Sequence, residues 1–221
     1  MLCFITTDAA VTKAELTAAT REAVDQSFNR ISVDGDMSTN DTVVIMANHQ
    51  AGNKTITRSG TGSSEFREAL TEVMQCLARK IVSDGERVTK LVEVQVRGAA
   101  SHLDAERVAR TVANSKLVKC SWNGNDPNWG RVIHAVGYSG ARVKEELVDI
   151  YFNGVLATQN GVAAKTDIDK LSAAVKETEF TVGIDLNLGK GEFNVWTSDL
   201  SSEYVEFNRE EYALNRKTTK R

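Results

Sequence analysis

The chain has 221 residues, 41% of them hydrophobic, which is enough to bury a core in one or two domains; we expect one domain over residues 1–212 and a basic tail over residues 213–221. The formal net charge of −3 provides no basic surface for nucleic acid. The apolar stretches are too short to span a membrane and residues 1–10 lack the features of a secretory signal, so the sequence predicts a soluble protein.

Cysteine and histidine usage gives no support for disulfides or for a metal site. The three cysteines are odd in number and far apart in the sequence, at Cys3, Cys76 and Cys120. This pattern predicts buried free thiols and a reducing compartment. The histidines are equally dispersed, and the run Asp34-Gly35-Asp36 lacks the other ligands of a calcium loop. We therefore predict no metal.

The start of the chain predicts strand, helix and strand. Thr6 and Thr7 belong to a short strand. Thr12 and Glu15 form a capping box that starts a helix extending to Asn29. The apolar run over residues 43–47 is typical of a buried strand.

A polar loop and a long helix follow. Residues 52–64 are expected to form an exposed loop, and an apolar stripe predicts a helix over residues 65–82. Gly85 suits a left-handed terminator of that helix. Glu86 then lies just beyond a helix end.

The middle of the chain alternates between strand and helix patterns. Valines alternate with polar residues over 92–96, which predicts a half-buried strand. Ser101 with Asp104 caps a third helix. Apolar runs over residues 132–136 and 148–152 are predicted to be strands.

The C-terminal part of the chain predicts a fourth helix followed by two strands. Thr166 with Asp169 caps a fourth helix, whose inner face is expected to be Ile168, Leu171 and Val175. Residues 180–186 alternate as a strand, and the turn at residues 189–191 is predicted to make a hairpin with the strand that follows. We expect a mixed α/β protein with flanking helices and a partly antiparallel sheet.

Two polar segments are candidates for a functional site. The run over residues 27–42 holds three carboxylates and two carboxamides beside the strand at residues 43–47, although a capped surface turn would have the same composition. The segment from Asp126 to Arg131 contains the only proline, Pro127. Here the simpler interpretation is a rigid turn in which Arg131 pairs with Asp126.

These segments resemble the ornithine acetyltransferases, also called bifunctional glutamate N-acetyltransferases, in their C-terminal β chain. The resemblance rests on six ordered matches that span nearly the whole chain. They are residues 1–9, Phe28-Asn29 with residues 33–42, Ser83-Asp84-Gly85-Glu86, residues 114–119, residues 126–131, and Thr197-Ser198-Asp199-Leu200 through Tyr204-Val205 to Asn208.

The resemblance implies a self-cleaving precursor and an N-terminal-nucleophile-type acyltransferase. A threonine freed by cleavage would be the nucleophile, activated by its own α-amine. Its position is immediately before Met1, so this chain holds no catalytic residue, and the oxyanion hole would come from the α chain. Asn40 and Asp41 are expected to support the surroundings of the threonine.

The same resemblance implies that Glu86 and Asn208 bind substrate. Without it, Glu86 would be an exposed carboxylate after a helix end, and Asn208 a loop-capping side chain. Two features depart from the family pattern. Arg87 replaces the glycine that follows the Asp-Gly-Glu motif, and the chain continues beyond Tyr212, where family chains end soon after the asparagine.

The implied function is acetyl transfer from N-acetylornithine to glutamate, within arginine biosynthesis. The expected assembly is an α₂β₂ heterotetramer with the α chain of the same precursor, without nucleic acid or membrane partners. No cofactor is expected, with acetyl-CoA as a second acetyl donor left open. The expected location is the cytoplasm, or an organelle matrix in a eukaryote. The alternatives are a related N-terminal-nucleophile hydrolase, a specialised acetyltransferase, or an inactive isolated subunit.

Overall fold

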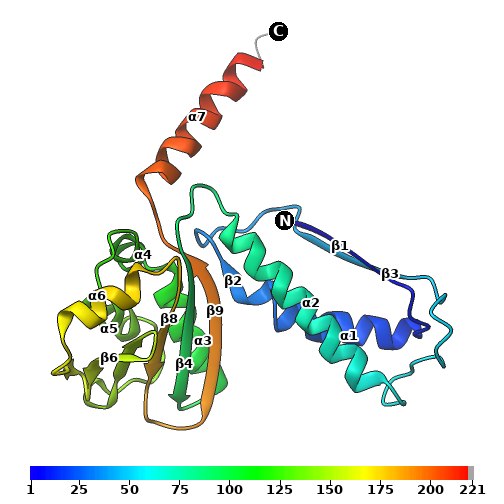
Figure 1. The fold of residues 1–221 in the computed structure, drawn as a ribbon, viewed down its shortest axis with the longest axis horizontal. Coiled ribbons are helices and arrows are strands. Elements are labelled where there is room, and N and C mark those ends of the chain that lie inside the picture. Colours follow the sequence, from blue (N-terminus) through cyan, green and yellow to red (C-terminus); the bar gives the residue numbers. More distant parts are fainter. Residues whose placement is uncertain (219–221) are drawn as a thin grey trace. The chain divides into compact units, whose positions relative to one another are not determined.

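A computed structural model describes residues 1–218 of the chain (Figure 1). It divides into two compact units, of residues 1–31 with 35–80 and of residues 32–34 with 81 onward. The single domain over residues 1–212 stays a prediction. Of the predicted tail, residues 213–218 belong to helix α7 (Ser202–Thr218), and the remainder lies outside the described residues.

The first unit combines a small parallel sheet with two helices. Strand β1 (Leu2–Thr7) pairs with β3 (Thr42–Ala47), and Leu2 lies opposite Thr42. Helix α1 (Lys13–Asp25) begins at Thr12, whose hydroxyl accepts a hydrogen bond from Glu15 N, as the capping box predicts. The 3₁₀ turn η1 (Phe28–Arg30) follows, and α2 (Ser63–Ser83) matches the predicted second helix.

A buried ion pair joins α1 to α2. Glu15 is 0% exposed and accepts hydrogen bonds from Arg67 Nε, Arg67 Nη2 and Ser63 Oγ, each at 2.8 Å. Arg67 also donates to Glu22 at 2.7 Å. The hydrogen bond from Arg67 lowers the pKa of Glu15 against the opposing effect of burial, so the carboxylate is charged at neutral pH.

The second unit is built on a seven-stranded sheet with the strand order β2-β9-β4-β8-β5-β6-β7. The central strand β4 pairs in parallel with β8 and antiparallel with β9. The strands are β2 (Ile31–Ser32), β4 (Leu91–Ala99), β5 (Asp149–Phe152), β6 (Val155–Gln159), β7 (Val162–Ala163), β8 (Glu179–Asp185) and β9 (Gly191–Ser198). This arrangement confirms the predicted mixed α/β class.

Helices pack against this sheet around a continuous apolar core. They are α3 (His102–Asn114), α4 (Lys116–Asn123), α5 (Trp129–Gly137) and α6 (Ile168–Lys176). The 3₁₀ turn η2 (Glu145–Leu147) and the described part of α7 contribute no residue to this core. Trp122 and Phe180 meet edge to face in the core, with ring centroids 6.0 Å apart. Ser101 caps α3 by accepting a hydrogen bond from Asp104 N, as predicted.

The predicted strand over residues 132–136 was wrong, because these residues form α5. The side chain of Asn128 caps this helix by accepting a hydrogen bond from Arg131 N at 3.0 Å. A short apolar run is compatible with a strand or with one face of a buried helix. The cap residue, and not the apolar run, indicates the helix.

The predicted hairpin at residues 189–191 was also wrong, because β4 lies between β8 and β9. The connection crosses the end of β4, where Leu188 N and Gly189 N both donate to Gly98 O. A Cβ on Gly189 would lie 2.6 Å from Ala99 O, so only glycine permits this close approach. Gly189 therefore allows the connection from β8 to β9 to pass close to the end of β4, and it does not form a two-residue hairpin turn.

Smaller corrections concern exposure and caps. The strand at residues 43–47 is half-buried to exposed, not buried. Asp167, not Thr166, caps α6, and Ile168 is 62% exposed whereas Leu171 and Val175 are buried. The remaining predicted helices and strands are present.

The three cysteines are free thiols, as predicted, but the prediction that all three are buried is correct only for Cys3. Cys3 is buried, which raises the pKa of its thiol, whereas Cys76 and Cys120 are exposed. Over residues 1–218, no helix is long and apolar enough to cross a membrane. In the same part of the chain, no three His, Cys, Asp or Glu side chains gather as metal ligands.

Candidate functional site

Asp41 lies beside the start of β1. Its Oδ1 atom is 2.6 Å from the backbone nitrogen of Met1. Asn40 precedes it, accepting a hydrogen bond at its carbonyl from Thr42 Oγ1 at 3.0 Å. The parallel register continues to this point, because Thr42 N donates to Met1 O. The two residues predicted to support the N-terminus therefore lie next to it.

Glu86 and Asn208, predicted separately from the sequence, lie in contact in the second unit. Asn208 Nδ2 donates to Glu86 Oε2 at 2.8 Å and to Tyr204 O at 3.0 Å. Both side chains are exposed and open to a ligand. The Glu86 carboxylate and the Asn208 carboxamide oxygen are hydrogen-bond acceptors, which suits a ligand that donates several hydrogen bonds, such as an ammonium group.

The first turn of α7 is tied to the segments around this pair. Ser201 Oγ donates to Arg87 O at 2.9 Å and accepts from Tyr204 N at 3.1 Å. Tyr204 Oη donates to Asp34 Oδ2 at 2.8 Å. These bonds position the helix that carries Asn208.

Asp199 links the segments around the Glu86–Asn208 pair. Its side chain is nearly buried and accepts hydrogen bonds from Thr89 N, Thr89 Oγ1, Lys90 N and Asn123 Nδ2, at 2.5–3.0 Å. One carboxylate thus joins the end of β9, the end of α4 and the segment that follows Glu86.

Lys119 is a second buried charge in this network. Its Nζ donates to Thr197 Oγ1 at 2.9 Å and to Ser198 O at 2.5 Å. Burial lowers the pKa of Lys119 to about 8, although the charge of Asp199 opposes the shift. The lysine thereby fixes the last residues of β9, immediately before Asp199.

Arg87 is the strained residue of the loop after α2. It has φ of 55°, in the left-handed region that costs a residue with a side chain on the order of 1–2 kcal/mol. Gly85, predicted to be a left-handed helix terminator, does not have positive φ. A Cβ there would lie 2.8 Å from Val88 Cγ2 and 3.1 Å from Val82 O, so the site is tightly packed. The guanidinium carbon of Arg87 lies 5.5 Å from the centroid of the Phe207 ring.

The segment from Asp126 to Arg131 serves the fold of the second unit. Asp126 accepts a hydrogen bond from Asn128 Nδ2 at 2.9 Å, and Arg131 Nη1 donates to Leu117 O at 2.8 Å. The proposed pairing of Arg131 with Asp126 is therefore not formed. The segment caps α5 and fastens it to α4.

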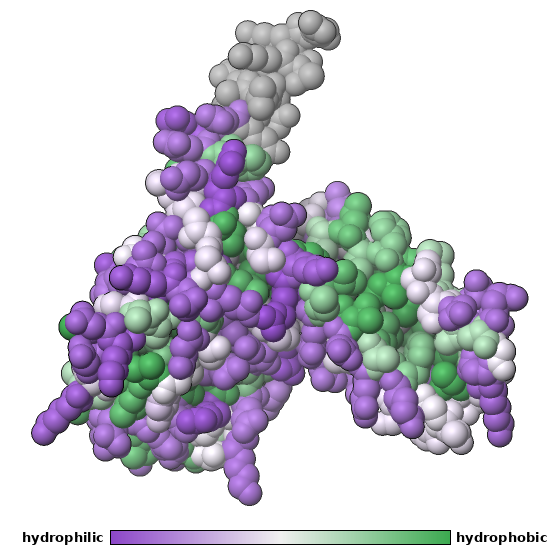
Figure 2. Space-filling model, in the orientation of Figure 1, coloured by the Kyte–Doolittle hydropathy of each residue, from purple (hydrophilic) through white to green (hydrophobic). Residues whose placement is uncertain are grey.

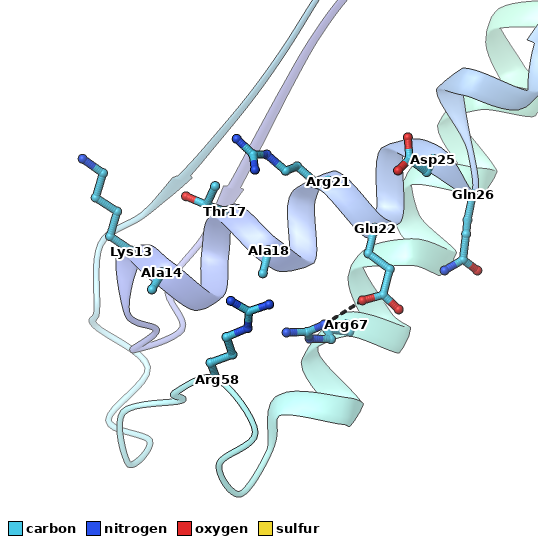
Figure 3. A pocket seen from close by; sticks show the side chains of 10 residues that line it. All are labelled: Lys13, Ala14, Thr17, Ala18, Arg21, Glu22, Asp25, Gln26, Arg58 and Arg67. Carbon is cyan, nitrogen blue, oxygen red and sulfur yellow. Dashed lines mark hydrogen bonds and ion pairs between the residues drawn. The ribbon is translucent and has the colours of Figure 1, made fainter.

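A groove along α1 carries several cationic side chains (Figure 3). Lys13, Arg21, Arg58 and Arg67 are among the residues that line it, together with Glu22. In Figure 3, Arg58, Arg67 and Glu22 lie on one side of α1, and Lys13 and Arg21 extend from the other. Arg67 is engaged by Glu15 and Glu22, as the dashed line in Figure 3 indicates for Glu22. We assign this groove no ligand, because its central cation already serves the ion pair between the helices.

The model of the ArgJ family matches residues 1–213 of the chain.

The chain belongs to the ArgJ family.

ArgJ relatives match along almost the whole chain. The arginine biosynthesis bifunctional protein ArgJ of Geobacter sulfurreducens is 51% identical, over 94% of this chain and 53% of its own length. The mitochondrial ArgJ of Schizosaccharomyces pombe is 42% identical, over 94% of this chain and 48% of its own. The chain therefore spans about half the length of the curated ArgJ relatives it matches.

The fold is also that of an ArgJ protein. The crystal structure of arginine biosynthesis bifunctional protein ArgJ from Bacillus halodurans superimposes with a TM-score of 0.91 at 39% identity, covering 95% of this chain and 99% of that one. The family predicted from the ordered motifs is confirmed.

Sequence reasoning did not identify the residues that support the Glu86–Asn208 pair in this ArgJ chain. Lys119 and Asp199 fell within matched motifs, but no local spacing indicated that they share one network. Nothing in the sequence indicated a role for Phe207 except its position next to Asn208. Arg87 stood out only because it replaces a glycine of the family pattern.

Proposed function

We propose that this chain is the β chain of a glutamate N-acetyltransferase that moves an acetyl group from N-acetylornithine to glutamate through an acyl-threonine intermediate. Membership of the ArgJ family supports this proposal, as do the names of the relatives. The observation that carries it is the contact between Glu86 and Asn208. Glu86 and Asn208 come from motifs far apart in the sequence, were both predicted to bind substrate, and form one exposed hydrogen-bonded pair.

The pair has the chemistry for an amino-acid substrate. Glu86 supplies a negative charge for an ammonium group, and the carboxamide of Asn208 both orients that carboxylate and offers its own oxygen. Ornithine carries such a group on its side chain. The two residues would hold the substrate by this end while the acetyl group reacts elsewhere.

The proposed nucleophile is a threonine immediately before Met1. Continuing the register of β1 and β3 by two residues beyond the pair of Leu2 and Thr42 would set this threonine opposite Asn40, with Asp41 opposite Met1. Asn40 and Asp41 would then both lie next to the proposed nucleophile. This geometry supports the role expected for Asn40 and Asp41 as residues that orient the N-terminus.

The proposed reaction has two half-steps. The threonine Oγ attacks the acetyl carbonyl while the α-amine takes the hydroxyl proton; the amide C–N bond then breaks and ornithine leaves with that proton. The amine of glutamate attacks the resulting ester, giving N-acetylglutamate and restoring the hydroxyl. Oxyanion donors would come from the α chain. Acetyl-CoA as a second donor, and a location in the cytoplasm or an organelle matrix, remain parts of the proposal.

The test is to express this chain with its upstream half and to add N-acetylornithine. We expect mass spectrometry to find one acetyl group on a threonine directly before Met1, and glutamate to remove it. Glu86→Gln is expected to raise the KM for N-acetylornithine about 10- to 100-fold, the effect of losing a hydrogen bond to a charged group.

Glu206→Gln is the matched control, because Glu206 is an exposed carboxylate on the same helix as Asn208. We expect it to leave KM unchanged. Loss of the acetyl group to water at the same rate with and without glutamate would favour a hydrolase, and absence of any adduct would favour an inactive subunit.

The proposed α chain needs a docking surface, and the outer face of the β1–β3 sheet fits one. Leu2 and Phe4 are 67% and 66% exposed and Met46 is 52% exposed. The register places these side chains on one face, opposite Cys3, which is buried. Figure 2 shows apolar surface gathered on the first unit.

An isolated sheet of this kind is unusual in a folded protein. Parallel sheets are normally covered on both faces, and two strands alone are marginally stable. Neither strand has a second strand neighbour among residues 1–218, and the outer face carries no charge. Because relatives are about twice as long, we propose that the α chain covers this face and extends the sheet.

Phe4→Glu is expected to weaken association with the separately expressed upstream half about 100-fold, because it buries a charge in an apolar contact. Analytical ultracentrifugation of the two halves measures this directly. Val162→Glu is the control, since Val162 is similarly exposed at 65% but lies on β7 of the second unit. Equal binding by both variants, or a homodimer of this chain that Phe4→Glu disrupts, would overturn the assignment.

A further inference from the structure

Two neighbouring residues of the loop after α2 meet two neighbouring residues of α7. Glu86 accepts the hydrogen bond from Asn208, and the guanidinium of Arg87 lies over the ring of Phe207 at 5.5 Å. The dipeptides 86–87 and 207–208 are thus joined by two adjacent contacts of different chemistry. A third bond, from Ser201 Oγ to Arg87 O at 2.9 Å, fixes the backbone of the same arginine.

The two contacts differ in chemistry. The hydrogen bond joins two exposed side chains, and such contacts exchange readily with water. Phe207 is half-buried and Arg87 is exposed, so the guanidinium covers part of an apolar ring. The arginine contact therefore adds a second restraint on the loop beside the hydrogen bond.

The backbone of Arg87 is part of this arrangement. Its φ of 55° turns the chain sharply after Glu86, and the side chain leaves the turn toward α7. A glycine would adopt this φ with less strain but would have no side chain to place on Phe207. Arg87 is therefore a strained residue whose cation reaches the helix that carries Asn208.

We propose that Arg87 and Phe207 form a clamp that holds Glu86 and Asn208 in their ligand-binding geometry. Both are positioning residues, since neither needs to touch the substrate for this effect. The kinetic part of the proposal rests on the proposed function, whereas the clamp itself concerns only contacts within the second unit.

The decisive variants are Arg87→Gly and Phe207→Leu. Arg87→Gly keeps the left-handed backbone and removes the cation, and Phe207→Leu keeps an apolar side chain and removes the ring. Each is expected to raise the KM for N-acetylornithine about 2- to 5-fold while kcat changes less than about 2-fold. The double variant is expected to match the single variants, because one contact is lost in all three. Arg87→Lys retains a cation and should recover part of the loss.

A second readout is independent of catalysis. Amide hydrogen exchange in residues 84–88 and in the first turn of α7 is expected to rise in Arg87→Gly about as much as KM does. Because glycine relieves backbone strain, the melting temperature should not fall, which separates the clamp from general destabilisation.

The outcomes divide clearly. Unchanged exchange in both variants overturns the clamp, whatever the activity. Raised exchange with unchanged KM in an active enzyme overturns the role in ligand binding. If the paired wild-type chains transfer no acetyl group, the proposed function fails, and raised exchange still supports the clamp.

Discussion

Replacing Asp199 with alanine is expected to lower the free energy of unfolding of the second unit by about 3–5 kcal/mol. The Asp199 residue is 3% exposed, and its carboxylate accepts the four hydrogen bonds from Thr89, Lys90 and Asn123. Alanine would leave these donors without an acceptor where water has little access. All three tryptophans lie in this unit, so tryptophan fluorescence during urea unfolding reports the change.

Asp169→Ala is the matched control for this variant. Asp169 is an exposed carboxylate in the first turn of α6, and its loss should cost less than about 1 kcal/mol. If Asp199→Ala shifted the urea midpoint no further than Asp169→Ala, the network around Asp199 would not have the stabilising role assigned to it.

Lys119 gives the same unit a pH dependence with a definite sign. Its pKa is about 8 in the folded chain, below the value of about 10.4 expected when unfolded. Between these two pH values the unfolded chain retains a proton that the folded chain has released, so the free energy of unfolding rises with pH. Because the charge of Asp199 opposes the shift, the rise should begin at lower pH in Asp199→Ala.

Replacing Arg67 with methionine is expected to destabilise the first unit by about 3–5 kcal/mol at neutral pH. The change leaves Glu15, which is 0% exposed, with only Ser63 Oγ as a hydrogen-bond donor. The first unit contains no tryptophan, so hydrogen exchange of the α1 and α2 amides is the suitable measurement.

The pH dependence of this ion pair distinguishes it from simple packing. Because pairing lowers the pKa of Glu15, the pair stabilises the folded chain above pH 4.3 or so, and this contribution is lost as pH falls through the folded pKa. In Arg67→Met the lowering effect of the arginine is lost, so the pKa of Glu15 should rise and the pair's contribution above pH 4.3 or so should disappear.

A double variant completes the test. Glu15→Leu with Arg67→Met removes both charges and is expected to be closer to wild type than Arg67→Met alone. If the double variant were the less stable of the two, the burial of an unpaired Glu15 charge could not be the cause of the loss.

Local signals predicted local structure well. The hydroxyls of Thr12 and Ser101 cap α1 and α3 as their spacing indicates, and the alternating valines of β4 point into the core. Such features depend on residues three or four positions apart, or on alternate positions, and the sequence contains them directly.

The errors arose where the outcome depends on distant residues. Nothing between residues 180 and 198 indicates that β4 separates β8 from β9, because that neighbour comes from residues 91–99. The apolar run over residues 132–136 was predicted to be a strand because nothing in the run itself shows that Asn128 caps a helix there. The network of Lys119 and Asp199 joins residues about eighty positions apart, and no spacing rule covers such a distance.

For the candidate site, the resemblance supplied Glu86 and Asn208, and the structure showed that they meet. Arg87 was noticed as an exception, but its contact with Phe207 required coordinates. The motifs thus supplied the proposed substrate-binding residues, whereas the contacts around them depend on packing between distant segments.

The uncovered face of β1 and β3 has a consequence for how a cell would supply this chain. Copies of this chain made in excess of the proposed α chain would expose apolar, unpaired strands and tend to aggregate. Translating both halves as one polypeptide, as the proposed function requires, makes them in equal number. Under the proposed function, synthesis as a single precursor would therefore protect the chain from aggregation, in addition to generating a reactive terminus.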